Sequence, residues 1–210
     1  PDDNGVYEIN TGIEESVSIS VAGAADDNIY VNNQRIAADG KAEIAISSQS
    51  EIKTVRITVQ NGEKQPVYAY LKLIPDDVKA AEQVEELIDA IGDVTLDSYD
   101  DITAARTAYD KLSDNAKTLV GSYETLTAAE EALAQAEADA VSAATDAIDE
   151  IGNVTADSKE KIDSAKDAYS AVPERLRDKV TNSDTLDKAT ERFAVIDTIK
   201  QAGAKSKEHF

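Results

Sequence analysis

One stretch of this sequence occurs twice, and the duplication constrains the fold more than any other feature. Residues 88–98 recur as residues 148–158, and the register then continues without a gap at an offset of 60 residues. Self-similarity over this length indicates a repeated structural unit. The second half of the chain should therefore build one fold twice. Its matched positions include Ile102 and Ile162, Ala105 and Ala165, Tyr109 and Tyr169, Val120 and Val180, and Leu126 and Leu186.

Each copy carries the spacing and end signals of three helices. Apolar residues recur at intervals of three and four, which favours helices with one buried face. We expect the first helix to end at Gly92 or Gly152, because glycine readily takes the left-handed conformation of a helix C-cap. The Asp-Ser pairs at 97–98 and 157–158 are expected to cap the second helix.

The remaining breaks also fall at equivalent places. The second helix should end near residues 113–114 in one copy and 173–174 in the other, with Pro173 suited to a first helical position. The third helix should begin near Thr125 or Thr185. Each copy is therefore predicted to be a three-helix bundle.

The two copies are expected to share a helix. No Pro or Gly interrupts residues 125–151, and this stretch is rich in Ala and Glu. Both residue types favour helix, and a long segment offsets the cost of starting one. We therefore predict a continuous helix across residues 128–148, which ends the first bundle and begins the second.

Residues 1–75 have the period of two that is typical of strands with one buried face. Apolar residues alternate with polar ones in five segments: 17–21, 29–31, 42–46, 55–59 and 67–74. Turn-forming residues separate them at 25–28, 31–34, 39–40 and 61–62. Six or seven short strands at this spacing predict a small antiparallel β-sandwich, which Pro75 ends.

The predicted fold is thus multidomain α+β. A β-sandwich module at 1–75 precedes a first three-helix repeat at 76–137 and a second at 138–202, and a polar tail at 203–210 should fray. The chain begins at Pro1 rather than Met, so we expect a mature or excised fragment of a longer protein.

Composition excludes several kinds of chemistry. The chain has no cysteine and a single histidine, His209, which removes thiol catalysis, disulfides, Cys-ligated zinc and a Ser-His-Asp triad. A net charge of -21 disfavours nucleic acid and anionic membrane surfaces. No apolar run has membrane-spanning length. We therefore predict no catalytic residue, no cofactor and no membrane insertion in this fragment.

The carboxylates have one candidate metal site among them. Asp26, Asp27, Asn28 and Asn32 could bind calcium at a loop edge, although an ordinary turn explains the same residues. The acidic pairs elsewhere fall at helix starts or on exposed helix faces, where capping and solvation account for them.

The tyrosines allow two interpretations. Those of the β-module, Tyr7, Tyr30, Tyr68 and Tyr70, could stack on sugars or pack against cross-strand neighbours. Those of the repeats, Tyr109 and Tyr169, lie on apolar helix faces and are expected to pack in the bundle cores.

Two family resemblances accompany these patterns. The strings at 29–32, 40–44, 55–59 and 70–73 resemble bacterial cadherin-like β-sandwich modules, with Asn33 where those modules usually have Gly. The duplicated string at 88–98 and 148–158 is similar to the FIVAR-type three-helix repeats of Gram-positive surface proteins and secreted glycosidases.

These resemblances imply a non-catalytic accessory or spacer region of a large secreted or cell-wall-attached protein of a Gram-positive bacterium. Its partners would be neighbouring domains of the same polypeptide, one of which it would display on a stiff rod. The parent would be a glycosidase or an adhesin. The alternative is a binding module for a host glycan or a host protein.

Overall fold

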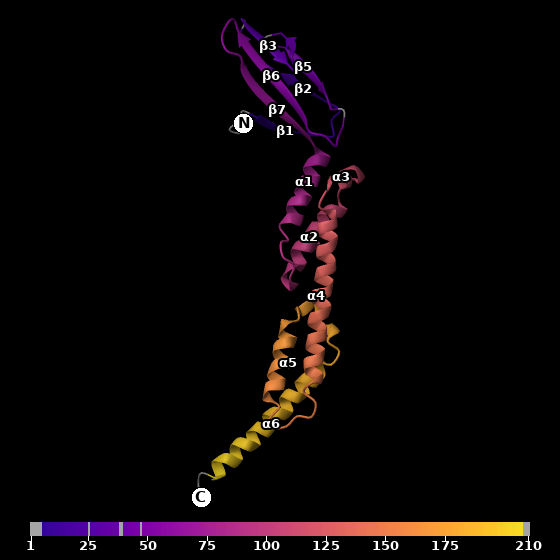
Figure 1. Cartoon of the computed structure of the whole chain (residues 1–210), viewed down its shortest axis with the longest axis vertical. Helices are drawn as coiled ribbons and strands as arrows, with labels where there is room; N and C mark the ends of the chain where they lie inside the picture. The colour runs from indigo at the N-terminus through magenta and orange to yellow at the C-terminus, as the bar shows by residue number, and fades with distance from the viewer. Residues whose placement is uncertain (1–5, 25, 38–39, 47, 208–210) are drawn as a thin grey trace. The chain divides into compact units, whose positions relative to one another are not determined.

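The computed structural model describes residues 6–24, 26–37, 40–46 and 48–207 (Figure 1). All described strands precede all described helices, so the predicted order of a β-module and a helical region is confirmed. The strands are β1 (Val6–Gly12), β2 (Ser16–Ser20), β3 (Asp27–Val31), β4 (Gln34–Ile36), β5 (Lys41–Ala45), β6 (Lys53–Asn61) and β7 (Val67–Pro75).

The strands form a five-stranded sheet in the order β1-β7-β6-β3-β4 and a two-stranded sheet of β2 and β5. One pairing corrects the prediction of an all-antiparallel module, because β1 runs parallel to β7. Parallel neighbours need a long connection. The first and last strands of the module have the other five strands between them in sequence, which supplies one.

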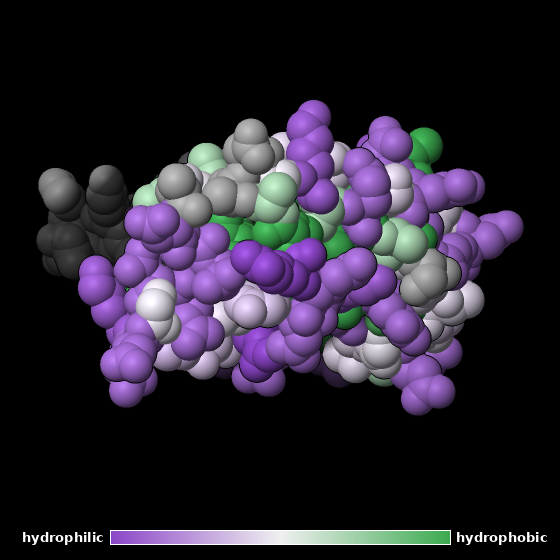
Figure 2. Space-filling model, turned by 90° about the horizontal axis from the view of Figure 1, so that it is seen from above, coloured by the Kyte–Doolittle hydropathy of each residue, from purple (hydrophilic) through white to green (hydrophobic). Residues whose placement is uncertain are grey.

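The core of the β-module consists of apolar residues from both sheets. Its buried members are Ile19, Val31, Ile44, Ile46, Val55 and Leu73. Val55 and Leu73 are fully buried, so neighbouring strands of the larger sheet direct the same face inward. Figure 2 shows a view dominated by hydrophilic residues, with hydrophobic ones gathered in a band between them. The predicted alternation therefore locates the buried face correctly.

The turn between β3 and β4 is also as expected. Asn32 and Asn33 have φ values of 50° and 68°, the left-handed pair that a two-residue hairpin turn requires. Asn33 therefore adopts a left-handed conformation, which asparagine tolerates better than most residues other than glycine. The short strand β4 and the parallel strand β1 are absent from the five predicted segments. Ala25 and Asp39, in two predicted turns, lie outside the described residues.

The helical region repeats its elements at the predicted offset. Its helices are α1 (Asp76–Asp89), α2 (Tyr99–Asp110), α3 (Asp114–Leu119), α4 (Tyr123–Asp149), α5 (Lys159–Ala171) and α6 (Ser183–Lys207), with 3-10 turns η1 (Leu96–Ser98) and η2 (Glu174–Lys179). The unbroken α4 confirms a continuous helix across 128–148. The predicted end of the helical repeats at residue 202 falls inside α6.

Several predicted helix ends are displaced. Gly92 and Gly152 have left-handed φ values of 58° and 56°, but α1 and α4 end three residues before them. Pro173 is an N-cap residue, one position before the first helical position predicted for it. Shifts of one to three residues arise because helix ends often unwind into turns, which side-chain periodicity does not reveal.

The chain divides into two compact units: residues 1–92 with 101–126, and residues 93–100 with 127–210. In the first unit, Ser50 Oγ donates a 2.9 Å hydrogen bond to Asn115 Oδ1, so a loop of the β-module contacts α3. The second unit has its own buried core, which includes Ile148, Ile162 and Val172. The predicted domain boundaries at 75 and 137 differ from this division and stay a prediction about independent folding.

Candidate functional site

The four calcium candidates are not brought together. Asp27 begins β3 and Asn32 follows its end, so the strand separates them by about 16 Å at roughly 3.3 Å per residue. The two carboxylate oxygens of Asp27 accept 2.8 Å hydrogen bonds from the Asn61 side chain and the Ala24 N–H. These bonds, led by that from Asn61, lower the pKa of Asp27. Asn32 Oδ1 accepts from the Arg56 N–H, at 3.0 Å.

These contacts are those of turns, and they engage the side-chain oxygens of Asp27 and Asn32. The described part of the chain holds no group of three or more His, Cys, Asp or Glu residues that could bind a metal ion. The acidic pair at 76–77 serves a structural purpose as well. Asp77 accepts hydrogen bonds from Ser113 Oγ at 2.7 Å and Asn115 Nδ2 at 2.6 Å, and so fixes α1 to α3.

The tyrosines of the β-module separate onto two faces of the larger sheet. Tyr7 lies opposite Leu71, whose side chain packs on the core, so Tyr7 is on the inner face. The strand register instead aligns four residues in one row across the outer face, from β4 to β7: Arg35, Tyr30, Thr58 and Tyr68. Thus Tyr30 and Tyr68 share an outward-facing row with an arginine.

A second row lies beside the first. Arg56 is opposite Tyr70, and Tyr70 is opposite Val6. The Arg56 guanidinium lies 5.9 Å from the centre of the Tyr68 ring and donates a hydrogen bond to Asn33 Oδ1, so the two rows are in contact. We name Arg35, Tyr30, Tyr68, Arg56 and Tyr70 the tyrosine–arginine face.

The tyrosines of the repeats are half-buried. Tyr169 packs against the buried core of the second unit, as expected for it. Tyr109 stacks on Tyr123 with ring centres 4.6 Å apart, and Arg106 lies within 5.6 Å of both ring centres. Tyr169 has Arg177 at 5.6 Å from its ring centre. Each ring therefore forms a cation–π contact with an arginine, which an apolar helical period alone does not predict.

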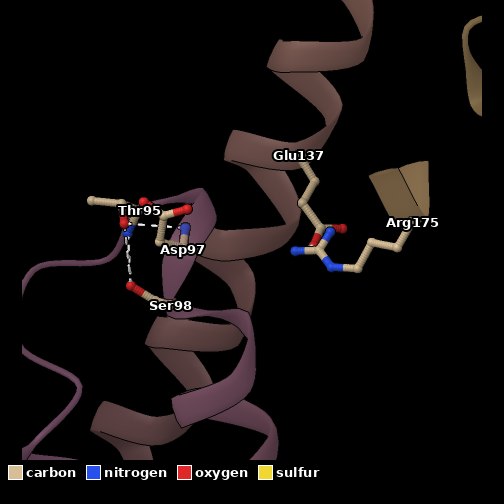
Figure 3. A network of polar contacts seen from close by, with 5 residues as sticks. All are labelled: Thr95, Asp97, Ser98, Glu137 and Arg175. Atoms are coloured by element: carbon tan, nitrogen blue, oxygen red, sulfur yellow. Dashed lines mark hydrogen bonds and ion pairs between the residues drawn. The ribbon is translucent and has the colours of Figure 1, made fainter. Parts of the chain in front are cut away.

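The second unit contains an open groove of about 960 Å³, lined by residues of the turn at 95–100 and of the segment 170–177. Arg175 lies 4.0 Å from the centre of the Tyr99 ring and forms a 2.8 Å ion pair with Glu137 of α4. Figure 3 shows Glu137 and Arg175 directed toward each other. Arg175 therefore connects the turn of the first copy with the helix that leads into the second.

Beside Arg175 lies a cap that occurs in both copies. Ser158 is the N-cap residue of α5, as expected, but its side chain makes no capping hydrogen bond to that helix. Thr95 Oγ1 accepts from the Asp97 N–H at 3.3 Å, and the Thr95 N–H donates to Ser98 Oγ at 3.0 Å (Figure 3). The cap therefore centres on threonine, with the serine as its partner. The threonine precedes the helix by a 3-10 turn, which the helical pattern alone did not show.

No motif or periodic pattern in the sequence singles out Arg175, Tyr99 or Glu137. Their counterparts in the duplication are Asn115, Lys159 and Asp197, so the arginine and tyrosine have no equivalent in the other copy. Departures from an otherwise regular repeat were the available signal. They mark the place where one copy meets the next.

Comparisons with protein families, with curated proteins and with solved structures found no match. Among the described helices, none is long and apolar enough to cross a membrane.

Proposed function

We propose that this chain is a non-catalytic accessory or spacer region of a large secreted or cell-wall-attached bacterial protein, which displays a neighbouring domain on a stiff helical segment. The observation that carries the proposal is the continuity of α4. This helix has 27 residues, which corresponds to about 40 Å at 1.5 Å per residue. A single helix between two copies leaves no flexible linker there.

The contact of Arg175 with Tyr99 and Glu137 supports the same function. It adds a side-chain connection beside the helix, where the turn of the first copy meets the second copy. A spacer needs such connections because a lone helix bends more easily than one with lateral support. In the finer structure that we propose, the two sheets form a cadherin-like β-sandwich, and each copy forms a FIVAR-like three-helix bundle.

Distance measurements between spin labels test the stiffness of α4. The chain has no cysteine, so Glu124→Cys and Asp146→Cys, both exposed on α4, would carry the only two labels. A continuous helix places the two backbone positions about 33 Å apart, and we expect a narrow distance distribution near that value. The same pair with Ala134→Pro, which breaks the helix, is the control. Equally broad distributions in both proteins would contradict the spacer proposal.

A binding module for a host glycan or host protein is the second candidate. The tyrosine–arginine face favours it, because tyrosine and arginine are enriched where protein surfaces bind partners. A screen against immobilised glycans and plasma proteins separates this function from a spacer, which would bind none of them.

A further inference from the structure

The tyrosine–arginine face differs in charge from the molecule that carries it. The chain has a net charge of -21, yet the two rows of this face hold Arg35 and Arg56 and no carboxylate. The neighbouring row adds Lys72, which pairs with Glu8 at 2.9 Å and so contributes no net charge. At physiological ionic strength, charges further away than about 8 Å are largely screened. A ligand at this face therefore interacts with the nearby arginines rather than with the net negative charge of the whole chain.

The geometry of the face suits an extended ligand whose rings offer apolar faces. Adjacent strands lie about 4.8 Å apart, so the row from Arg35 through Tyr30 and Thr58 to Tyr68 spans about 14 Å. Tyr68 is 49% exposed, and Arg35 is also exposed. Aromatic rings offer apolar faces beside hydroxyl groups, and guanidinium groups bind carboxylates through two parallel hydrogen bonds.

We propose that the tyrosine–arginine face binds an acidic polysaccharide, with tyrosine rings against the sugar rings and Arg35 and Arg56 on their carboxylates. The inference goes beyond the spacer function and does not depend on it. It rests on the alternative binding function, for which it names the surface and the class of ligand.

A sugar with spaced carboxylates fits better than nucleic acid, which also stacks on aromatic rings. Nucleic acids carry a phosphate on every nucleotide and usually need several cations along their path. The face supplies two arginines beyond the paired Lys72, in a chain that is strongly acidic elsewhere. An acidic peptide would pair with the arginines, but it would stack on the tyrosines only if it contained aromatic residues.

Isothermal titration with the full chain tests the proposal. The probes are a hyaluronan oligosaccharide, which carries carboxylates, and a chitin oligosaccharide of equal length, which is neutral. We expect hyaluronan to bind at least about tenfold more tightly, and its affinity to fall as salt is raised. Tyr68→Ala and the double variant Arg35→Ala/Arg56→Ala should each weaken binding by about tenfold or more.

Matched substitutions away from the face control for general effects of charge and aromatic content. Lys41→Ala removes an exposed cation from β5, and Tyr7→Ala removes a tyrosine that is 45% exposed on the inner face. Both should change the affinity less than about twofold. Tyr68→Phe keeps the ring and should retain most of the binding, and the thermal unfolding of every variant shows whether it is folded.

Three results would overturn the proposal. The first is the absence of hyaluronan binding at millimolar concentration. The second is equal weakening by the control variants. The third is tighter binding of oligothymidylate or polyglutamate than of hyaluronan, which would assign the face to another class of ligand. Because the spin-label distances do not depend on any ligand, failure here leaves the spacer proposal to its own test.

Discussion

The two copies of the helical repeat share their caps and differ in their aromatic contacts. In both, a threonine N–H donates to a serine hydroxyl three residues later, at 3.0 Å from Thr95 and 2.9 Å from Thr155. Both serines are buried. Such agreement indicates that these residues stabilise the fold of the repeated unit. Residues that differ between the copies show where each copy makes contacts of its own.

The aromatic clusters show such a difference. The first copy has a Tyr109–Tyr123 stack beside Arg106, whereas the second has Ser183 in place of Tyr123 and Lys166 in place of Arg106. Tyr123 is 39% exposed, so the stack lies at the surface of the first unit rather than in its buried core. The first copy therefore gains a contact that the duplicated core does not need.

The largest expected effect concerns core positions that are equivalent in the two copies. Ile88 and Ile148 are equivalent and almost fully buried, at 2% and 0% exposure. Ile88→Ala and Ile148→Ala should each lower the free energy of unfolding by about 2–5 kcal/mol, because each leaves a cavity. Urea unfolding followed by circular dichroism measures both. If one substitution costs less than about 1 kcal/mol, the two cores are not equivalent.

Such core positions are also what the sequence predicted best. The offset between the copies and the unbroken run from 125 to 151 led directly to the paired elements and to α4, because helical periodicity and the absence of breakers are local signals. The parallel strand β1 was not predicted, since its partner β7 lies at the opposite end of the module. Pairing across that distance leaves no local pattern.

The candidate sites show the same limit. The tyrosines at 30, 68 and 70 were recognised as candidates, but their shared face depends on the strand register, which one sequence does not give. Three of the calcium candidates, Asp26, Asp27 and Asn28, lie at the start of β3, whereas Asn32 follows its end. Arg175 was not predicted because Tyr99 and Glu137 belong to other elements, and only folding brings them to it.

The second prediction sharpens the comparison of the aromatic clusters. Tyr109 and Tyr169 are half-buried, so truncation should cost less than the 3–5 kcal/mol or so of a fully buried aromatic ring. Tyr109→Ala should be more costly than Tyr169→Ala by about 1 kcal/mol, since it also removes the stack on Tyr123. The measurement is the free energy of unfolding of each variant in urea.

Removal of Tyr123 controls for this difference between the two tyrosine variants. Tyr123→Ser gives the first copy the residue of the second, and in that background Tyr109→Ala and Tyr169→Ala should cost about the same. A difference that persists without Tyr123 would show that the stack is not its cause.

A smaller and equal effect is expected at the caps. Thr95→Ala and Thr155→Ala each remove the hydroxyl that accepts a 3.3 Å hydrogen bond from the backbone N–H two residues later. Loss of a cap costs about 1 kcal/mol. Thermal unfolding should show nearly equal decreases in Tm for the two alanine variants. Thr→Ser at either position keeps the hydroxyl and should lower Tm much less than Thr→Ala. Unequal decreases would mean that the caps differ in more than position.

The smallest expected effect concerns Arg175, whose contacts also have no counterpart in the other copy. Arg175 stacks on Tyr99 and pairs with Glu137, and its side chain is 28% exposed. An exposed cation–π contact contributes about 0.5–1 kcal/mol, and a surface ion pair often contributes almost nothing. We therefore expect Arg175→Ala to lower the free energy of unfolding by about 0.5–1 kcal/mol. The equivalent substitution in the first copy, Asn115→Ala, instead removes hydrogen bonds to Asp77 and Ser50.

A double-mutant cycle separates the two contributions of Arg175. Arg175→Lys keeps the charge near Glu137 but loses the planar group that lies on Tyr99, so its effect estimates the stacking alone. Coupling between Arg175→Ala and Glu137→Gln should weaken as salt is raised, whereas coupling between Arg175→Ala and Tyr99→Ala should persist, because stacking includes a packing contribution that salt does not screen. If both couplings are zero, Arg175 is an ordinary surface residue and α4 alone connects the copies.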